Sequence, residues 1–322
     1  MANPNVGQRV AANWELVVKT KPEDQINNDY WLFNRLSKGD GFVGKSGGDF
    51  IVQPIEYQLN GTVASYSDLD VISTTRYDNF DRYEAQWKEY AGTYAISDLE
   101  SDRNAGDGQV FDLRAAKLQN LLNSIRSTFN TDLFGAGTAN SSKVFTGLQA
   151  LVSTSPSSST VQGVDRQANS FARNQQTSGA QTTSAFDNLR AAMRSIYNLS
   201  SNGISGDHPS FGVTTRTVFE GFEGLLLANE RFADKSSGDG GFSNEVLKFK
   251  GMLLSFDSAC PSGNLYMLNP AYLKLVYKTG SWMKAQPAIR PVNQTADFIV
   301  IRTMANLFAT NPRRLGVVSS IT

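Results

Sequence analysis

The sequence predicts an α+β fold in which helices and strands interleave without the strand–helix–strand order of a parallel sheet. Two patterns support this class: a period-two alternation that begins near Asp49, and a three- and four-residue apolar spacing over residues 112–134. The length of 322 residues corresponds to about two domains. Hydrophobic residues make up 40% of the chain, which is enough to build a core and too much for a disordered protein.

The first 45 residues mix polar stretches with an aromatic cluster, Tyr30, Trp31 and Phe33, that precedes several glycines. We interpret residues 1–45 as an arm that docks its aromatic side chains, rather than as a compact domain. The spacing permits a short helix over residues 22–37.

Residues 49–96 are expected to form a very long β-hairpin. Ile55 and Tyr57 alternate with polar residues, and a second strand-like stretch rich in aromatic residues runs over 76–96. Fifteen residues at ~3.3 Å each reach about 50 Å, and an isolated two-stranded ribbon is marginally stable in water. No other segment is patterned to cover this ribbon, so we expect a neighbouring subunit to support it.

Residues 112–134 carry the clearest helical pattern in the chain. Apolar side chains recur on one face from Leu113 to Leu133, Asp112 is placed to cap the start, and Gly135 to end it. At 1.5 Å per residue the helix is about 35 Å long. This is a long helix for a globular domain.

The remainder alternates short elements. Residues 138–184 are polar and are interpreted as surface loop or weak sheet. The elements expected after them are a helix from Ser184, a strand over 211–215, a helix through Val218 to Leu226, two short strands over 246–256, a helix opening at Asn269-Pro270, and strands over 298–301, 307–309 and 315–318.

Composition excludes several classes of function. Thirty basic residues balance 30 acidic ones, which argues against a DNA-coating protein, because such a protein needs a basic surface. Cys260 and His208 are the only residues of their types, so an internal disulfide and a multi-histidine metal site are impossible. The N-terminus lacks a signal-peptide pattern and the apolar runs are too short to span a bilayer. We expect a soluble product of a reducing cytoplasm with no membrane contact.

The segment Gly39–Ser46 fits the phosphate-binding pattern G-x-x-x-x-G-K-[ST]. That chemistry needs a buried strand before the loop and a helix after it, so that backbone N–H groups face the phosphates. Here Asn34–Lys38 is polar, and Gly47-Gly48 and a strand follow. A P-loop nucleotide-binding enzyme is therefore disfavoured and is kept as an alternative.

Other candidate sites are also weak. His208 lies beside Pro209 without a G-x-S-x-G motif elsewhere, which favours a solvated loop histidine over a hydrolase triad. Asp98, Glu100 and Asp102 have calcium-loop spacing, but Arg103 stands where the turn needs glycine. We therefore predict no catalytic, cofactor-binding or metal-binding residues, and no enzyme activity.

Several segments follow one another in a defined order from Gly47 to the C-terminus. They are Gly47–Phe50 with Pro54–Tyr57, Gln86–Tyr90 with Ile96–Asp98, the helix from Asp112 to Gly135 with Phe145–Leu148, Glu245–Gly251 with Asp257–Pro261 and Asn269-Pro270, and Asn311–Gly316. In this succession, which covers most of the chain, they resemble the major capsid protein of tailed bacteriophages, of the Hong Kong 97 type.

The resemblance implies a Hong Kong 97-type fold with four parts. These are an N-terminal arm (1–45), an extended β-hairpin loop (46–98), a peripheral domain with a long spine helix (99–137 and 286–322), and an axial domain (138–285). Because no long charged helical segment precedes residue 45, a fused scaffolding domain is not expected.

The function implied is that of an icosahedral head shell enclosing double-stranded DNA, assembled from hexamers and pentamers in the bacterial host cytoplasm and present in the virion. Expected partners are other copies of the chain, a separate scaffolding protein, a portal and a possible decoration protein, with no sequence-specific DNA binding and no cofactor. An encapsulin-like nanocompartment shell around an enzyme cargo is the alternative that keeps the fold.

Inter-subunit contacts are expected on the extended loop and near the C-terminus. The residues concerned are Tyr57, Tyr66, Asp68, Asp70, Arg76, Tyr77 and Trp87 in the loop, and Arg313 and Arg314 in the peripheral domain. The chain has no lysine between Lys45 and Lys88, so a covalent lysine–asparagine crosslink from the loop is not expected. Shell strength would then be non-covalent.

Overall fold

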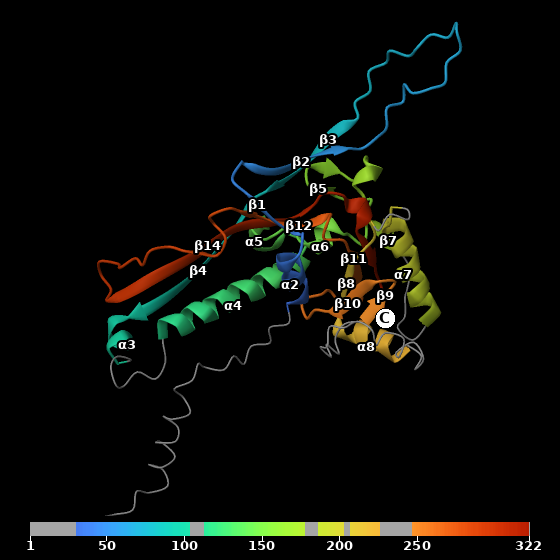
Figure 1. The fold of residues 1–322 in the computed structure, drawn as a ribbon. Coiled ribbons are helices and arrows are strands. Elements are labelled where there is room, and N and C mark those ends of the chain that lie inside the picture. The colour runs from blue at the N-terminus through green and yellow to red at the C-terminus, as the bar shows by residue number, and fades with distance from the viewer. Residues whose placement is uncertain (1–29, 104–112, 178–185, 203–206, 226–246, 322) are drawn as a thin grey trace, which may run out of the picture.

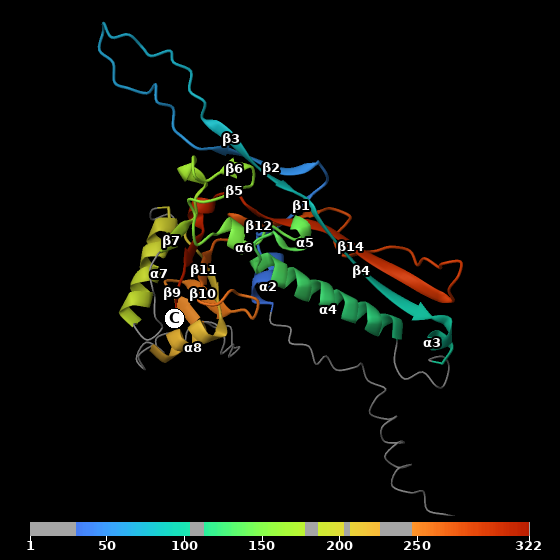
Figure 2. The same cartoon turned by 180° about the vertical axis from the view of Figure 1, so that it is seen from behind.

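A computed structural model describes residues 30–103, 113–177, 186–202, 207–225 and 247–321 (Figure 1). The molecule is elongated. One lobe holds a long helix beneath a sheet, a second lobe holds another sheet with two helices, and a hairpin projects away from both (Figures 1 and 2).

The first lobe is built on a five-stranded sheet. Its strands are β1 (Phe42–Lys45), β4 (Lys88–Ser97), β12 (Leu273–Lys278), β13 (Lys284–Ala285) and β14 (Ala296–Ala309). Strand β14 pairs antiparallel with β4 from Ala296↔Ser97 to Ala305↔Lys88, and then with β12. The long helix α4 (Leu113–Phe134) packs against β4, where Gly92 leaves room for Leu121.

The second lobe is built on a six-stranded sheet in the order β7-β15-β11-β8-β10-β9. These strands are β7 (Gln175–Thr177), β8 (Phe211–Thr214), β9 (Leu247–Phe249), β10 (Met252–Phe256), β11 (Leu265–Leu268) and β15 (Gly316–Val318). Leu265 and Met267 pack with helices α7 (Phe186–Ser200) and α8 (Arg216–Leu225), whereas Tyr266 and Leu268 face the main core. The sheet is therefore buried on both faces.

The aromatic residues near the start of the described chain dock as predicted. Helix α2 (Trp31–Lys38) buries Phe33, whose ring centroid lies 6.2 Å from that of Phe129 on α4. The carboxylate of Asp257, after β10, accepts the backbone N–H of Leu32 at 3.2 Å and the side-chain amide of Asn130 at 2.7 Å. A residue 225 positions away thus caps the start of α2, for which Tyr30 supplies no side-chain cap.

Burial raises the pKa of the Asp257 carboxyl, because no solvent reaches it, and its N–H donors oppose that rise. Asn130 is also buried, and its side-chain oxygen accepts the N–H of Phe33 at 3.4 Å. Asp257 and Asn130 therefore join α2, α4 and the six-stranded sheet at one point.

The hairpin consists of β2 (Phe50–Glu56) and β3 (Phe80–Gln86), paired antiparallel from Phe50↔Gln86 to Glu56↔Phe80. Its base is anchored, because Ile51, Tyr83 and Ala85 pack against Val276 and Phe308. Residues 58–79 form no strand and extend away from the body (Figures 1 and 2). The predicted hairpin is confirmed over β2 and β3, whereas its two-stranded ladder does not extend through residues 58–79.

The prediction of a single ribbon over residues 49–96 is wrong for the second half of that range. Strands β3 and β4 are separate and have different partners, because β4 joins β14 of the same chain. Part of the support that we expected from a neighbour therefore comes from β14. Strand β14 itself is one 14-residue strand, where two short strands were expected.

The helix expected at Asn269-Pro270 is also wrong. The Asn269 side chain accepts the N–H of Ala271 at 3.0 Å, which makes one turn, and β12 then begins at Leu273. Asn-Pro signals a turn as well as a helix start, and the sheet partners on both sides of β12 decide the outcome.

Two domain boundaries conflict with the sheet pairing. Strand β12 lies in the five-stranded sheet although residues up to 285 were expected in the axial domain. Strand β15 pairs with β7 and β11 of the six-stranded sheet although 286–322 were expected in the peripheral domain. Pairing between residues far apart in the sequence determines which sheet β12 and β15 join, and local sequence patterns do not reveal such pairing.

The interpretation of residues 138–184 as surface loop or weak sheet is wrong in part, because α5 (Ala139–Ser142) and α6 (Leu148–Leu151) form there and Leu148, Leu151 and Val152 are buried.

Several other elements follow the predictions. Helix α4 and strands β8, β9, β10 and β15 lie within a few residues of their expected bounds. Residues 1–29, including the first half of the helix expected over 22–37, and the capping residues Asp112 and Ser184 lie outside the described part.

A substitution at Gly147 tests how closely the chain packs at the end of α4. A Cβ atom at this position would lie 2.4 Å from the carbonyl oxygen of Gly135 and 2.5 Å from that of Asp132, and backbone cannot move aside cheaply. We expect Gly147→Ala to lower the free energy of unfolding by about 2 kcal/mol or more, measured by urea denaturation of the isolated chain.

Gly47→Ala is the matched control, because nothing lies within 4 Å of a Cβ atom there. We expect its effect to stay within about 0.5 kcal/mol. Equal stability of the two variants would contradict the close packing described at Gly147.

Candidate functional site

Exposed apolar side chains gather on the hairpin. Among the described residues, 14 large apolar side chains are exposed, and ten of them lie between Phe50 and Phe80. The ten are Phe50, Val52, Leu59, Val63, Tyr66, Leu69, Val71, Ile72, Tyr77 and Phe80. Since soluble monomers rarely expose such concentrated apolar surface, the hairpin has the character of a protein-binding surface.

The tip of the hairpin is a hydrogen-bonded turn. The N–H of Asp70 donates to the carbonyl of Ser67 at 3.0 Å, and the Asp70 carboxylate accepts the N–H of Ser67 at 2.8 Å. Asp68 and Leu69 stand at its apex, with Leu69 96% exposed. The last backbone bond across the hairpin runs from the N–H of Tyr57 to Asn79, at 3.1 Å.

The predicted aromatic contact residues make bonds within the chain. Tyr57 donates to the carbonyl of Asp78 at 2.6 Å, Tyr66 donates to that of Thr62 at 3.0 Å, and Trp87 donates to that of Gly48 at 2.8 Å. The rings of Tyr66 and Tyr77 nevertheless stay more than 40% exposed. Trp87 instead is partly buried and packs against the apolar cluster at the hairpin base. Arg76 and Asp68 are exposed, and the inter-subunit role of all these residues stays a prediction.

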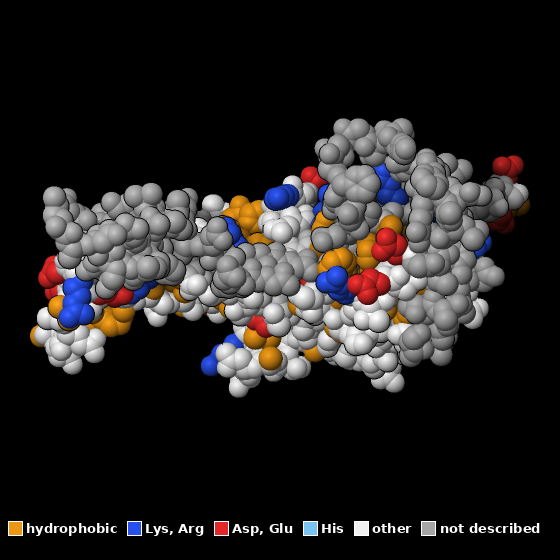
Figure 3. Space-filling model, turned by 90° about the horizontal axis from the view of Figure 1, so that it is seen from below, with side chains coloured by type: hydrophobic (Ala, Val, Ile, Leu, Met, Phe, Trp, Pro, Cys, Tyr) orange, Lys and Arg blue, Asp and Glu red, His pale blue; other side chains and the backbone are white. Residues whose placement is uncertain are grey.

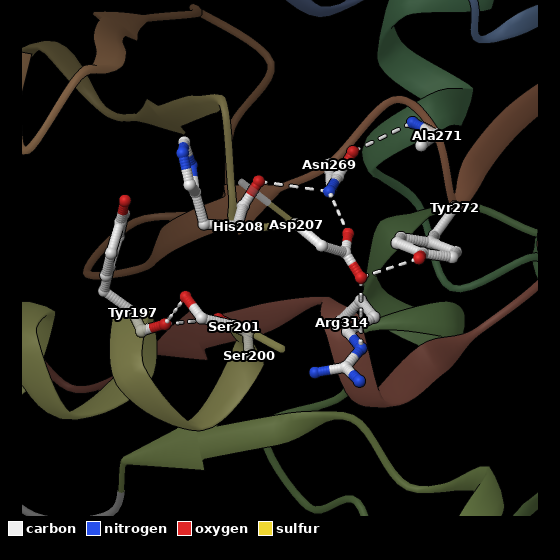
Figure 4. Close-up of polar contacts among 9 residues, drawn as sticks. All are labelled: Tyr197, Ser200, Ser201, Asp207, His208, Asn269, Ala271, Tyr272 and Arg314. Carbon is white, nitrogen blue, oxygen red and sulfur yellow. Dashed lines mark hydrogen bonds and ion pairs between the residues drawn. The ribbon is translucent and has the colours of Figure 1, made fainter. Parts of the chain in front are cut away.

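Arg314 is held inside its own chain (Figure 4). It lies in the short 3₁₀ helix η3 (Pro312–Arg314), and its Nε is 3.8 Å from the Asp207 carboxylate. Asp207 also accepts the Tyr272 hydroxyl at 2.8 Å and the Asn269 amide at 3.3 Å. The hydrogen bond to Asp207 raises the pKa of Tyr272.

Arg313 points elsewhere. Its side chain is exposed, and no carboxylate pairs with it in the part of the chain that the structure describes. Of the two C-terminal arginines expected at an interface, Arg313 is therefore the one whose charge is available to a partner.

A groove lies at the base of the hairpin, between β2 and η3. It has a volume of about 690 Å³ and brings together residues that are far apart in sequence. Tyr57 stacks on Phe171 with ring centroids 5.0 Å apart, and Leu199, Arg313 and Arg314 also line the groove. We call this the hairpin-base groove. It unites three of the predicted contact residues, Tyr57, Arg313 and Arg314.

Sequence reasoning missed two residues of this groove. Phe171 lies in the polar stretch 138–184, which was interpreted as surface loop. No helical or strand-like spacing of apolar residues surrounds it, so no local pattern indicated that it belongs to a site. Leu199 lies in the last turn of helix α7 and is 55% exposed. The sequence alone does not distinguish it from the apolar residues that α7 buries. An isolated aromatic residue in a polar loop was the only available signal.

The segment Gly39–Ser46, which the sequence context disfavoured as a phosphate loop, forms no phosphate loop in the structure. Residues 42–45 form strand β1, which pairs in parallel with β12, and β2 begins at Phe50 without a helix after Ser46. The Lys45 ammonium donates to the carbonyl of Val52 at 3.0 Å. An extended strand points alternate N–H groups to opposite sides, so it cannot cradle a phosphate.

The acidic residues at 98–102 form part of a helix and not a calcium loop. They lie in α3 (Asp98–Arg103), at the narrow end of the molecule, where Figure 3 shows acidic and basic side chains side by side at the left. Glu100 pairs with Lys117 at 2.7 Å, and Asp98 pairs with Arg290. No group of three metal-ligating side chains was found among the described residues.

A membrane-spanning helix is not found either. None of the helices in the described ranges is both long enough and apolar enough to cross a bilayer.

Comparison with solved structures identifies the fold. No family model and no curated protein matches the sequence. Among solved structures, the capsid asymmetric unit of cyanophage A-1(L) matches with a TM-score of 0.68 at 13% identity, over 100% of this chain and 97% of that one. The native GTA particle capsid matches with a TM-score of 0.63 at 11% identity, over 99% and 100%.

A third match is the holo-SrpI encapsulin complex from Synechococcus elongatus PCC 7942, with a TM-score of 0.62 at 13% identity over 100% of this chain and 96% of that chain. The capsid of Myoviridae phage XM1 is also similar over the full length of both chains. The chain therefore has the Hong Kong 97-type fold, and the predicted α+β class and resemblance are confirmed at the level of the fold.

The exposed tip and the buried base of the hairpin should respond differently to substitution. We expect Leu69→Ser and Val71→Ser to change the free energy of unfolding by no more than about 0.5 kcal/mol, since both side chains are over 90% exposed. Ile51→Ala, at a position 1% exposed, should cost about 2–5 kcal/mol. Urea denaturation followed by tryptophan fluorescence measures both. A large loss for the tip variants would mean that the tip packs on its own subunit.

Proposed function

We propose that this protein is the subunit of an icosahedral shell, namely the head shell that encloses the double-stranded DNA of a tailed phage. The observation that supports this most directly is the projecting hairpin, which exposes ten large apolar side chains on a subunit that otherwise buries its core. Several similar structures, including those of cyanophage A-1(L) and phage XM1, are capsids.

The hairpin supplies the contact that joins subunits. Residues 58–79 carry backbone N–H and C=O groups outside any strand, and these groups can pair with the edge of another chain. Burying the apolar tip against a neighbour removes it from water, at about 25 cal/mol per Å². Each contact can be weak, because closed symmetry repeats it in every subunit.

The division into functional parts belongs to the same proposal. The five-stranded sheet and α4 form the peripheral domain, and the six-stranded sheet with α7 and α8 forms the axial domain around the five- and six-fold axes. Residues before β1 form the arm, and residues 46–87, between β1 and β4, form the extended loop. Scaffolding, portal and decoration proteins act as separate partners in assembly in the host cytoplasm.

An encapsulin-like nanocompartment is the second candidate. The encapsulin of Synechococcus elongatus matches this chain over its whole length, with a TM-score close to that of the GTA capsid. Purified particles distinguish the two functions, since nuclease-protected DNA supports a virion shell and an enclosed enzyme supports a nanocompartment.

Shortening the hairpin tests the proposal. Residues 58–78 are replaced by an Asn-Gly turn, which joins the ladder ends at Tyr57 and Asn79. We expect the variant to keep its melting temperature, because the base of the hairpin is unchanged, and to lose assembly into shells. Differential scanning calorimetry and negative-stain electron microscopy measure the two properties.

The full-length protein, expressed with the same neighbouring genes, is the control. Shells of normal size and yield from the shortened variant would refute the role given to the hairpin.

A further inference from the structure

The hairpin-base groove offers an apolar floor that is open to water. Tyr57 and Phe171 stack in it at a centroid distance of 5.0 Å, and Leu199 beside them is 55% exposed. Leu199 and the ring pair together give the groove an apolar surface that a partner can cover.

The rim of the groove is basic. Arg313 lines both the groove and an adjoining hollow that contains Arg173, and Glu56 is the carboxylate that lines the groove. Arg173 donates to the carbonyls of Arg166 and Gln167, both at 2.7 Å. These acceptors are neutral, so they do not cancel the positive charge of Arg173.

A third arginine lies beneath this rim. Arg166 is 1% exposed and donates to the carbonyls of Ala150 and Leu151. Burial lowers the pKa of Arg166 to about 10, so the group stays charged at neutral pH. Burial also raises the pKa of the neighbouring Tyr83 to about 12, and the charges of Arg166 and Arg313 oppose that rise. The region as a whole therefore favours an anionic occupant.

The hairpin tip has the complementary composition. Between Gln58 and Thr75 the only charged residues are Asp68 and Asp70. The Asp70 carboxylate is used in the turn with Ser67, which leaves Asp68 at the apex for a partner. The neighbouring Leu69, Val71 and Ile72 are 96%, 91% and 66% exposed. The tip is thus an acidic group flanked by apolar side chains.

A subunit does not fill its own groove in this structure. The groove is lined by the base of the hairpin, from Gln53 to Tyr57, whereas the apex lies eleven residues farther on. Eleven extended residues reach about 35 Å, and both views show the tip directed away from the body (Figures 1 and 2). A tip that enters the groove must come from another molecule.

We infer that the hairpin-base groove of one subunit receives the hairpin tip of a second copy of this chain, with Leu69 against Phe171 and Leu199 and with Asp68 paired to Arg313. This inference rests on the proposed function, since it names the receptor for the hairpin. The contact joins two different surfaces, and repeating such a head-to-tail contact by rotation closes a ring.

Cysteine crosslinking tests the contact directly. The variant with Leu69→Cys and Leu199→Cys is oxidised during assembly. We expect covalent multimers larger than dimers on a non-reducing gel, because each chain is linked through its tip to one neighbour and through its groove to another. The native Cys260 is 7% exposed, which keeps the background low.

The matched control combines Leu69→Cys with Val292→Cys, a fully exposed position in the loop before β14. This pair should give dimers at most. Multimers from the control pair and none from the test pair would overturn the inference.

A charge exchange provides an independent test. Asp68→Arg and Arg313→Glu should each lower the assembled fraction about tenfold or more, since each places like charges together at the contact. The variant that carries both Asp68→Arg and Arg313→Glu should recover assembly, because every altered tip then meets an altered groove of the opposite charge. Lys284→Glu, an exposed charge change on β13, is the control and should assemble normally.

The outcomes separate the two proposals. Loss of assembly with Asp68→Arg but not with Arg313→Glu would overturn the groove as receptor and leave the shell function standing. Failure of the unaltered protein to form shells with its neighbouring genes would overturn both.

Discussion

The amide side chain of Asn306 holds the parts of the molecule in register. Its nitrogen donates to the carbonyl of Gln86 at 2.8 Å, and its oxygen accepts the N–H groups of Thr146 and Leu307, both at 2.9 Å. Asn306 is fully buried, so each of these polar atoms must be satisfied within the protein. One side chain on β14 thereby links the return of the hairpin with the segment that leaves α4.

A second polar joint, between Asp257 and Asn130, has the same character. Both side chains are buried and are bonded to the start of α2, so that α2, α4 and the six-stranded sheet cannot shift independently without breaking buried hydrogen bonds. The body of the subunit is rigid at both junctions. Such a body can present the hairpin in a constant direction to a neighbour.

The hairpin itself divides into two regions with opposite physical properties. Its base buries Ile51 and Tyr83 against strands of the same chain, whereas its tip leaves Leu69 and Val71 almost entirely in water. A tip of this kind adds nothing to the stability of the isolated subunit. Its apolar surface becomes favourable when another molecule covers it, which is consistent with the proposed role of the hairpin and with the basic, apolar groove proposed to receive it.

Local patterns determined a large part of this structure. The apolar spacing of residues 113–134 is visible without partners, because one turn of a helix brings residues three and four apart together. The period-two pattern predicted β2, and the resemblance of ordered segments predicted the fold class. These features depend on residues that are close together in the sequence, so their spacing can be seen in the sequence itself.

Tertiary structure alone decided the rest. Asn269-Pro270 opens a turn and not a helix because β12 finds β1 on one side and β14 on the other. Arg314 turns inward because Asp207 lies beside it, while Arg313, one position earlier, stays exposed. The groove exists only where Tyr57, Phe171 and Leu199 meet. Contacts between residues more than 25 positions apart depend on how the whole chain packs, and no local period records them.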